Sequence, residues 1–349
     1  MIYCTIPVPP GKNFRLALIC AVLSYALLEH PVRRSRWLSA RPARSMALSS
    51  SLTVCGVLLA LGAGAVAAKL ASKPSQKNIA AQTGRVPTAS GSGSGRDCLI
   101  GLTESVPVAC SFGDPKAAKT LVLFGDSHGD QWSTPLVAWA GQAGWRVVTY
   151  LKSSCSVADI PVYNMRLNRF SPECAQWRQS AIAQIQALHP DAIVIAEFSS
   201  GYIQGVLTNL GENAVTLTMW TDGLQRSVRA LHSSQIPMVV LRDSPTPGRD
   251  MKICLARADW HHLAATYCDS DRSVALDGSV TAAEREVASA AAVSFIDLSD
   301  NLCESGVCPA VRDGQIVYRD ANHLTTGFAG SLVDRLGASL ALALARPTR

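Results

Sequence analysis

The chain has 349 residues, of which 48% are hydrophobic and 17% charged, and its glycines and prolines are scattered without period. This composition excludes a collagen-like, coiled-coil or wholly disordered chain, and the length favours a globular core with an appendage. The net charge of +6 is uneven: twelve Lys and Arg stand against one acidic residue up to Arg96, and 20 against 25 from Asp97 onward. A nucleic-acid-binding protein would carry its basic excess on the folded domain, so that class is not favoured.

Two apolar runs lie in the basic N-terminal quarter. The run from Leu16 to Leu28 has 13 residues, which is the length of a signal-peptide core, but no small-residue cleavage site follows it. The run from Met46 to Ala68 has 23 residues without a charge, enough to span a bilayer about 30 Å thick. The sequence therefore predicts a membrane segment over residues 1–71, with one or two transmembrane helices.

The basic residues around these runs predict the orientation in the membrane. Five arginines lie between the runs, and three spaced lysines followed by a long domain come after the second run. Because long translocated domains largely escape the positive-inside bias, the arginine loop should be cytoplasmic and the chain after Ala68 extracytoplasmic, on the periplasmic or outer face. Residues 72–96 contain a Gly/Ser-rich stretch and are predicted to be a flexible linker, so the catalytic domain should span 97–349.

Eight of the eleven cysteines follow residue 96, and they form four pairs of near neighbours in the sequence. An even number of cysteines in an extracytoplasmic domain predicts disulfides, and proximity in the sequence favours the pairs Cys98–Cys110, Cys155–Cys174, Cys254–Cys268 and Cys303–Cys308. A zinc site would favour CxxC spacing, and the closest pair, Cys303 and Cys308, has no second close pair beside it. His261 and His262 are better explained as polar helix surface, so we expect no metal and no cofactor.

Short apolar runs alternate with helical segments in the outer domain. Strands are expected at 120–124, 146–150, 191–196, 238–242 and 294–297, and helices near 131–143, 173–188, 214–233, 282–292 and 326–345. This alternation predicts an α/β fold, a three-layer αβα sandwich with a parallel five-stranded sheet. Ligands of such sheets bind beyond the carboxyl ends of the strands, where hydroxyl and carboxyl side chains gather in this sequence.

Two motifs in this domain suit nucleophilic catalysis. Ser127 lies two residues beyond the first strand, between Gly125 and Gly129, near a helix N-terminus whose N–H groups can stabilise an oxyanion. An ordinary helix-capping serine is the alternative explanation. Asp320 and His323 precede the last helix, and a spacing of three can place both on one face of a turn. A carboxylate on one ring nitrogen leaves the other free to accept a serine proton, although a helix-start aspartate beside a solvated histidine has the same pattern.

Together these motifs resemble the SGNH/GDSL hydrolase superfamily. The Gly-Asp-Ser of residues 125–127 matches its first block, the Asp-x-x-His of residues 320–323 matches its last, and the resemblance extends over nearly the whole outer domain. It implies the SGNH fold, with Ser127 as nucleophile, His323 as base and Asp320 as the carboxylate that orients the base.

Two parts of the superfamily pattern are absent from this sequence. The oxyanion-hole glycine of the second block and the Gly-x-Asn-Asp of the third do not follow the second and third strands. The candidate substitutes are the backbone N–H of Ser153 or Ser154 and a polar group near Ser199 or Ser200. Asp126 and His128 are expected to help line the site, and His128 is not expected to be the base because its side chain is adjacent in sequence to the nucleophile.

A narrower resemblance is to the extracytoplasmic SGNH domain that is fused to acyltransferase-3 membrane proteins. It rests on the Gly-Asp-Ser-His motif, on Cys155 with Cys174 followed by Trp177, and on the Asp-x-x-His-Leu motif. Residues 24–33 (SYALLEHPVR) also look like the end of the last helix of an acyltransferase-3 domain. The resemblance implies that the chain is the tail, or a split version, of such a protein.

These resemblances imply a membrane-tethered serine O-acyltransferase, with acetyl as the expected group, that modifies a cell-envelope or surface polysaccharide through an acyl-serine intermediate. Two alternatives stay open: a carbohydrate esterase of the same fold, and an inactive envelope-binding fragment. The expected partners are an envelope saccharide acceptor, a membrane protein or domain of acyltransferase-3 type that delivers the acyl group, and the membrane, with no nucleic acid.

Overall fold

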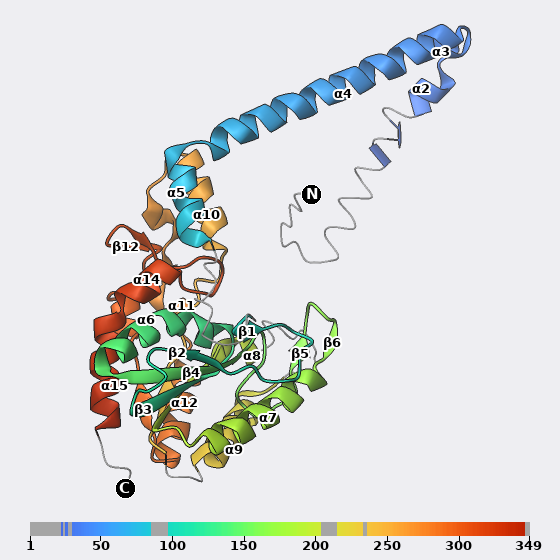
Figure 1. The fold of residues 1–349 in the computed structure, drawn as a ribbon. Coiled ribbons are helices and arrows are strands. Elements are labelled where there is room, and N and C mark those ends of the chain that lie inside the picture. The colour runs from blue at the N-terminus through green and yellow to red at the C-terminus, as the bar shows by residue number, and fades with distance from the viewer. Residues whose placement is uncertain are drawn as a thin grey trace. The chain divides into compact units, whose positions relative to one another are not determined.

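The structure is a computed structural model that describes residues 22–23, 25–26, 30–84, 97–203, 215–232 and 236–345. The chain divides into two compact units, Met1–Lys73 and Pro74–Arg349, and each is described by itself. Figure 1 shows the elements of both units along the chain.

The described part of the first unit includes the helices α2 (His30–Arg34), α3 (Arg36–Ser39) and α4 (Pro42–Ala71). Helix α4 contains the predicted run from Met46 to Ala68, and it is long and apolar enough to cross a membrane, with no buried residue. A proline is tolerated in the first turn of a helix because its missing N–H has no partner there, which suits Pro42 at the start of α4. The predicted run from Leu16 to Leu28 lies mostly outside the described residues.

Among the described residues of the second unit, the central sheet has seven strands in the order β1-β4-β3-β7-β8-β10, with β2 also paired to β4. The strands are β1 (Leu99–Ile100), β2 (Cys110–Phe112), β3 (Lys119–Gly125), β4 (Trp145–Lys152), β7 (Ala192–Ala196), β8 (Met238–Leu241) and β10 (Ser294–Ile296). All pairs are parallel except β2 with β4. The five predicted strands form the parallel sheet, and β1 and β2, too short to show periodicity, extend its edge.

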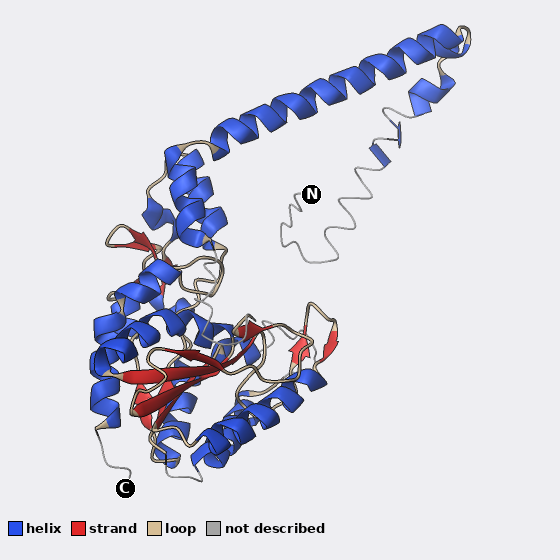
Figure 2. Ribbon diagram, in the orientation of Figure 1, coloured by secondary structure: helices blue, strands red, loops and turns tan. Residues whose placement is uncertain are grey.

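Helices cover both faces of this sheet, as Figure 2 shows by placing the red strands between blue helices. The longer helices are α6 (Ser127–Ala143), α7 (Pro172–Leu188), α9 (Leu217–His232), α10 (Met251–Trp260), α12 (Gly278–Ala290), α14 (Thr326–Ser331) and α15 (Val333–Leu344). The single helix predicted over 326–345 is thus divided into two at Leu332.

The side chains of β3 alternate between two apolar layers. Leu121 and Leu123 belong to the core that includes residues of α6, α14 and α15, and Val122 and Phe124 belong to the core that includes residues of α7, α9 and α12. All four are fully buried, and burying one such side chain contributes about 1.5–3 kcal/mol. A strand that is buried on both faces must be apolar throughout, which explains the unbroken run of the sequence and confirms the three-layer sandwich.

The first part of the predicted linker is helical. Residues Pro74–Thr83 form α5, which packs on α10 in the second unit. The Gln76 amide donates to Asp259 Oδ2 at 2.6 Å, and Gln82 Oε1 accepts a hydrogen bond from the Ile316 N–H at 2.8 Å. The compact unit that holds the sheet therefore begins at Pro74, and the Gly/Ser-rich stretch of residues 85–96 lies outside the described residues.

Four disulfides join neighbouring cysteines of the second unit. They are Cys98–Cys110, Cys155–Cys174, Cys254–Cys268 and Cys303–Cys308, the same neighbours that proximity in the sequence pairs. A native disulfide stabilises a fold by roughly 2–4 kcal/mol, mainly by restricting the unfolded chain. The second of the four ties the segment after β4 to the first turn of α7, at the carboxyl edge of the sheet.

Gly125 and Gly129 allow the turn between β3 and α6 to lie against β7. A Cβ atom on Gly125 would come within 1.9 Å of the carbonyl oxygen of Ala196, and one on Gly129 within 2.9 Å of the same oxygen. Neither glycine has a left-handed backbone. These glycines are therefore required for a close approach of two backbones rather than for an unusual turn conformation.

Gly125→Ala should destabilise the domain by about 2 kcal/mol, because its added Cβ must displace buried backbone. Gly141→Ala is the control, since Gly141 is exposed in α6 with no atom within 4 Å of an added Cβ. It should be neutral or stabilising by up to about 1 kcal/mol. Thermal unfolding of the two variants in detergent checks this, and equal melting temperatures would contradict the packing argument.

Candidate active site

Strand β3 and helix α6 place Ser127 at the carboxyl edge of the sheet. Asp126 caps α6, and its Oδ1 accepts a hydrogen bond from the backbone N–H of His128 at 2.7 Å. Ser127 is the first residue of the helix and is partly exposed. Its Oγ thus lies near the positive end of the helix dipole, which favours negative charge on a reacting group.

Asp126 connects this turn to the segment that follows β7. Its Oδ2 accepts hydrogen bonds from the Phe198 N–H at 3.0 Å and the Tyr202 hydroxyl at 2.7 Å. The carboxyl group is buried, and burial raises its pKa above the usual range in spite of the hydrogen bonds it accepts. With both oxygens engaged, Asp126 holds the turn that carries Ser127 in place.

The structure brings Ser127, His323 and Asp320 together as a hydrogen-bonded chain. His323 Nε2 lies 2.9 Å from Ser127 Oγ, and His323 Nδ1 lies 2.9 Å from Asp320 Oδ2. Asp320 Oδ1 also accepts hydrogen bonds from the backbone N–H groups of Asn322 at 3.0 Å and His323 at 2.8 Å. With a proton on Nδ1 facing the carboxylate, Nε2 is the nitrogen that can accept the serine proton.

The charges of this chain suit general base chemistry. Burial favours the neutral form of Asp320, but hydrogen bonds from His323 and Asn322 outweigh it and hold the pKa of Asp320 below its ordinary value. Burial also lowers the pKa of His323, against the opposing effect of Asp320. At neutral pH the pair is therefore a carboxylate beside an uncharged imidazole, the state that a base must have.

A pocket of about 160 Å³ opens over Ser127 and His323. Ser154 after β4 and Asn322 contribute to its wall, as do Phe198 and Tyr202 after β7. The remaining wall is formed by residues 162–166, which lead into and form the tip of the hairpin of β5 (Tyr163–Asn164) and β6 (Arg169–Phe170).

The residues predicted to form the oxyanion hole differ in whether they line the pocket. Ser154 lines the pocket with a left-handed backbone, φ 50°, a conformation in which a serine is strained and a glycine is not. The Ser153 N–H donates to the Ile100 carbonyl at 2.9 Å and so is not free for an oxyanion. Ser199 is buried outside the pocket, and its hydroxyl donates to Glu284 Oε1 at 2.7 Å.

His128 does not line the pocket, contrary to the expectation from the sequence. It is buried next to His323, and its Nδ1 lies 2.6 Å from Asp243 Oδ1. The first turn of α6 directs the side chain of residue 128 away from the opening because consecutive helical residues project in different directions.

Sequence reasoning missed Asn322 and the β5–β6 hairpin as parts of the pocket. Asn322 stands inside the Asp-x-x-His motif, and this position was the signal that could have indicated it. The hairpin strands have two residues each, so no periodic pattern distinguishes them from a loop.

A parallel sheet with a serine after β3 and an aspartate–histidine pair before the last helices defines an SGNH-type domain, a fold that supports esterase or acyltransferase activity. The sequence model of the family described as the SGNH domain fused to AT3 domains matches residues 97–337. This match covers more than half of the chain, so the chain belongs to that family. Helix α4 and the disulfides agree with a membrane-anchored extracytoplasmic domain.

The solved structures that are similar to this chain include an acetyltransferase domain and two esterases. The periplasmic domain of a lipopolysaccharide acetyltransferase from Salmonella ser. Paratyphi A has a TM-score of 0.50 at 13% identity, covering 65% of this chain and 85% of that one. A carbohydrate esterase family 2 enzyme from Myceliophthora fergusii has a TM-score of 0.41 at 14% identity, covering 67% of this chain and 68% of that one. An acetylxylan esterase from Geobacillus stearothermophilus has a TM-score of 0.39 at 16% identity, covering 67% of this chain and 97% of that one. The first likeness shows the fold alone, and no curated protein matches the sequence.

Ser127→Ala, His323→Ala and the double variant should each lose at least about 10³-fold in the hydrolysis of an aryl acetate, and by similar amounts. The reason is that the serine keeps its proton without the imidazole, so the second substitution removes nothing further. Steady-state kinetics of the three variants check this. Losses that multiply in the double variant would contradict a single catalytic unit.

Labelling of Ser127 by a fluorophosphonate should persist below pH 6.5, the ordinary pKa of histidine, because burial lowers the pKa of His323. Protonation removes the base, so the labelling rate falls only as the pH drops through this lowered pKa. Asp320 stays ionised over the same range because its own pKa is below the ordinary value. Rates measured from pH 4 to 9 should show a loss of labelling on the acid side of 6.5, and labelling already abolished at pH 6.5 would contradict the assignment.

Proposed function

We propose that this chain is a membrane-anchored serine O-acyltransferase, with acetyl as the group transferred, that modifies a cell-envelope or surface polysaccharide. The observation that carries the proposal is the hydrogen-bonded chain of Ser127, His323 and Asp320 in a domain of the family fused to AT3 domains. The catalytic domain would act outside the cytoplasm, in the periplasm or on the outer face.

In the first half-reaction, Ser127 Oγ attacks the carbonyl carbon of the acyl donor while His323 Nε2 takes the serine proton. Negative charge develops on the carbonyl oxygen beside the N-terminus of α6, and Asp320 stabilises the imidazolium. The tetrahedral intermediate then collapses: the bond to the leaving group breaks, and His323 returns the proton to that group. The products are acyl-Ser127 and the free donor alcohol or thiol.

In the second half-reaction, a saccharide hydroxyl gives its proton to His323 and attacks the acyl carbon. Collapse of this intermediate breaks the bond to Ser127 Oγ, which recovers its proton from His323, and releases the O-acylated saccharide. Water could attack in the same way and is present at about 55 M, so a transferase must hold its acceptor at an effective molarity that exceeds this value.

The β5–β6 hairpin supports acceptor binding because it is fixed in position beside Ser127. Arg169 forms an ion pair with Glu173 of α7 at 2.6 Å, and the Ser171 N–H donates to the Val162 carbonyl at 2.8 Å. A hairpin that is anchored in this way can position a ligand with little loss of conformational entropy.

The tip of the hairpin offers groups that suit a saccharide. Met165 and Arg166 are exposed and line the pocket, as does the partly buried Tyr163 ring. Among the described residues, the Arg166 side chain forms no ion pair, so its guanidinium is available to hydroxyl, carboxylate or phosphate oxygens of an acceptor.

The membrane segment and the family both support a membrane-bound source of the acyl group. Fusion to AT3 domains in this family suggests that a membrane protein or domain of that type delivers the acyl group. Helix α4 would keep the catalytic domain near this partner and near membrane-linked saccharides, whereas an esterase acting on a free polymer needs no anchor.

An esterase of the same fold is the second candidate, because the pocket over Ser127 opens to solvent and acyl-Ser127 would be accessible to water. Full-length protein in detergent, incubated with an aryl acetate and envelope saccharides, separates the two. Transfer predicts an acetylated saccharide in mass spectra, transient acetylation of Ser127, and less free acetate when saccharide is added. Unchanged acetate release without acetylated saccharide would favour the esterase, and no fluorophosphonate label on Ser127 would leave the inactive binding fragment.

Arg166→Ala should raise the KM for the saccharide acceptor by about tenfold and change donor hydrolysis without saccharide much less, because we expect the guanidinium to bind the acceptor. Lys116→Ala removes an exposed cation before the amino end of β3 and is the control. Acceptor titrations at fixed donor concentration measure both values. If the two variants have the same acceptor KM, the hairpin tip does not bind the saccharide.

A further inference from the structure

A second imidazole–carboxylate pair lies next to the catalytic one. His128, in the first turn of α6, is 1% exposed, and its Nδ1 lies 2.6 Å from Oδ1 of Asp243. Asp243 follows β8, so the pair joins the carboxyl ends of two strands of the sheet. The mechanism proposed above uses neither residue.

His128 is held in contact with the catalytic base. The centroids of the His128 and His323 rings are 4.8 Å apart, with the rings tilted by 55°. His128 also stacks on Phe198, with centroids 4.2 Å apart and an interplanar angle of 16°. The contacts with Asp243, Phe198 and His323 together fix the orientation of the His128 ring.

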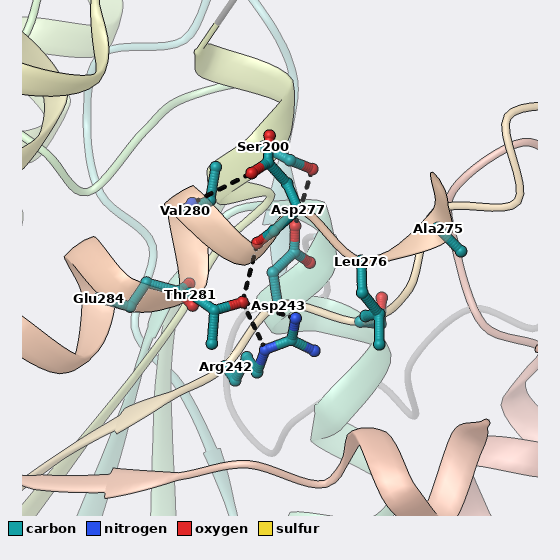
Figure 3. Close-up of a pocket in the computed structure, with 10 residues that line it drawn as sticks. Ser200, Arg242, Asp243, Ala275, Leu276, Asp277, Val280, Thr281 and Glu284 are labelled. Atoms are coloured by element: carbon teal, nitrogen blue, oxygen red, sulfur yellow. Dashed lines mark hydrogen bonds between the residues drawn. The ribbon is translucent and has the colours of Figure 1, made fainter. Parts of the chain in front are cut away.

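Asp243 also lines a second, small pocket, shown in Figure 3. The Ser200 hydroxyl lies 3.4 Å from Asp243 Oδ2, and the Arg242 guanidinium is hydrogen-bonded to Thr281 at 2.6 and 2.9 Å. The pocket has a volume of about 20 Å³, which is enough for one water molecule. Asp243 can therefore exchange a proton with solvent while His128 stays buried.

The surroundings of the pair limit its charge. Burial lowers the pKa of His128, although the neighbouring Asp126 and Asp320 oppose this effect and Arg319 adds to it. Burial also raises the pKa of Asp243. The pair therefore changes from uncharged to singly negative as Asp243 loses its proton.

The charged groups around Asp243 come from other elements packed against it. Arg242 favours its ionised form, and the buried Glu284 of α12 and Tyr202 after β7 lie close enough to interact with its charge. Asp243 itself lies within hydrogen-bond distance of the His128 ring.

We propose that His128 and Asp243 are positioning residues that hold His323 in line with Ser127 and stabilise the His323 imidazolium when Asp243 is ionised. The proposal rests on the proposed function, because it concerns the same serine and base. The proton taken from Ser127 stays on His323 until the leaving group accepts it, and no proton passes through His128.

Packing alone does not account for this pair. An apolar ring at position 128 would stack on Phe198 equally well, and a buried carboxylate with a histidine partner costs free energy of desolvation that apolar residues avoid. A polar pair in contact with His323 therefore favours a role that acts on that residue.

Asp243→Asn tests the electrostatic part of the proposal, because it keeps the shape of the side chain and removes its charge. The expected kcat for aryl acetate hydrolysis is about tenfold below wild type at pH 8 and within about threefold at pH 5.5, with KM unchanged. The loss grows with pH because the wild-type carboxyl gains its charge over this range. Glu284→Gln removes a neighbouring buried carboxyl and so favours the ionised form of Asp243, and it should show no loss that grows with pH.

His128→Phe tests the positioning part, since it keeps the stacking on Phe198 and removes the bond to Asp243. It should lower kcat about tenfold with KM unchanged, and melting temperatures identify any variant that is merely unfolded. A pH-independent loss in Asp243→Asn, or a loss equal to that of Glu284→Gln, would overturn the inference. The proposed function is tested separately by fluorophosphonate labelling of wild-type Ser127. If Ser127 is not labelled, the proposed function and the role of His128 and Asp243 both fail. If Ser127 is labelled but the variants do not show these effects, only the role of His128 and Asp243 fails.

Discussion

The close approach of the β3–α6 turn to β7 determines where Ser127 lies, and the rest of the site depends on it. Gly125 and Gly129 leave room for the Ala196 carbonyl, and Asp126 then links the turn to the segment after β7 through the N–H of Phe198. Because backbone contacts and a buried carboxyl fix this turn, the serine is held before any substrate arrives. Such preorganisation is what lets hydrogen bonds and a helix dipole act on a transition state without reorganisation.

Buried carboxyl groups gather at the same edge of the sheet. Burial raises the pKa of Glu197 and Glu284 to about 8 and that of Asp243 to about 7. Glu197 accepts hydrogen bonds from the residues after β4, Glu284 accepts one from Ser199, and Asp243 contacts His128. Asp320 differs, since its hydrogen bonds keep it ionised. The candidate site therefore has one carboxylate with a lowered pKa beside His323 and several carboxyl groups with raised pKa around it.

Local sequence patterns were sufficient for the main architecture and for the pairing of nearby groups. The five apolar runs predicted the parallel strands because a strand buried on both faces must be apolar, and the alternation with helices predicted the three layers. The spacing of Asp320 and His323 placed them on one turn, because that contact depends only on local backbone geometry. The uncharged run predicted the long apolar helix α4, because a candidate membrane span is recognised by its length and composition.

By itself, then, the sequence determined the class of fold, the apolar helix and the two motifs on which the proposed chemistry depends, because each is a pattern of neighbouring residues. The tertiary structure decided which groups meet. Ser127 and His323 are 196 residues apart, and His128 and Asp243 are 115 apart, so no local pattern records either contact. The same holds for the hairpin beside the pocket and for α5 on α10, where packing against distant residues outweighs weak local preferences.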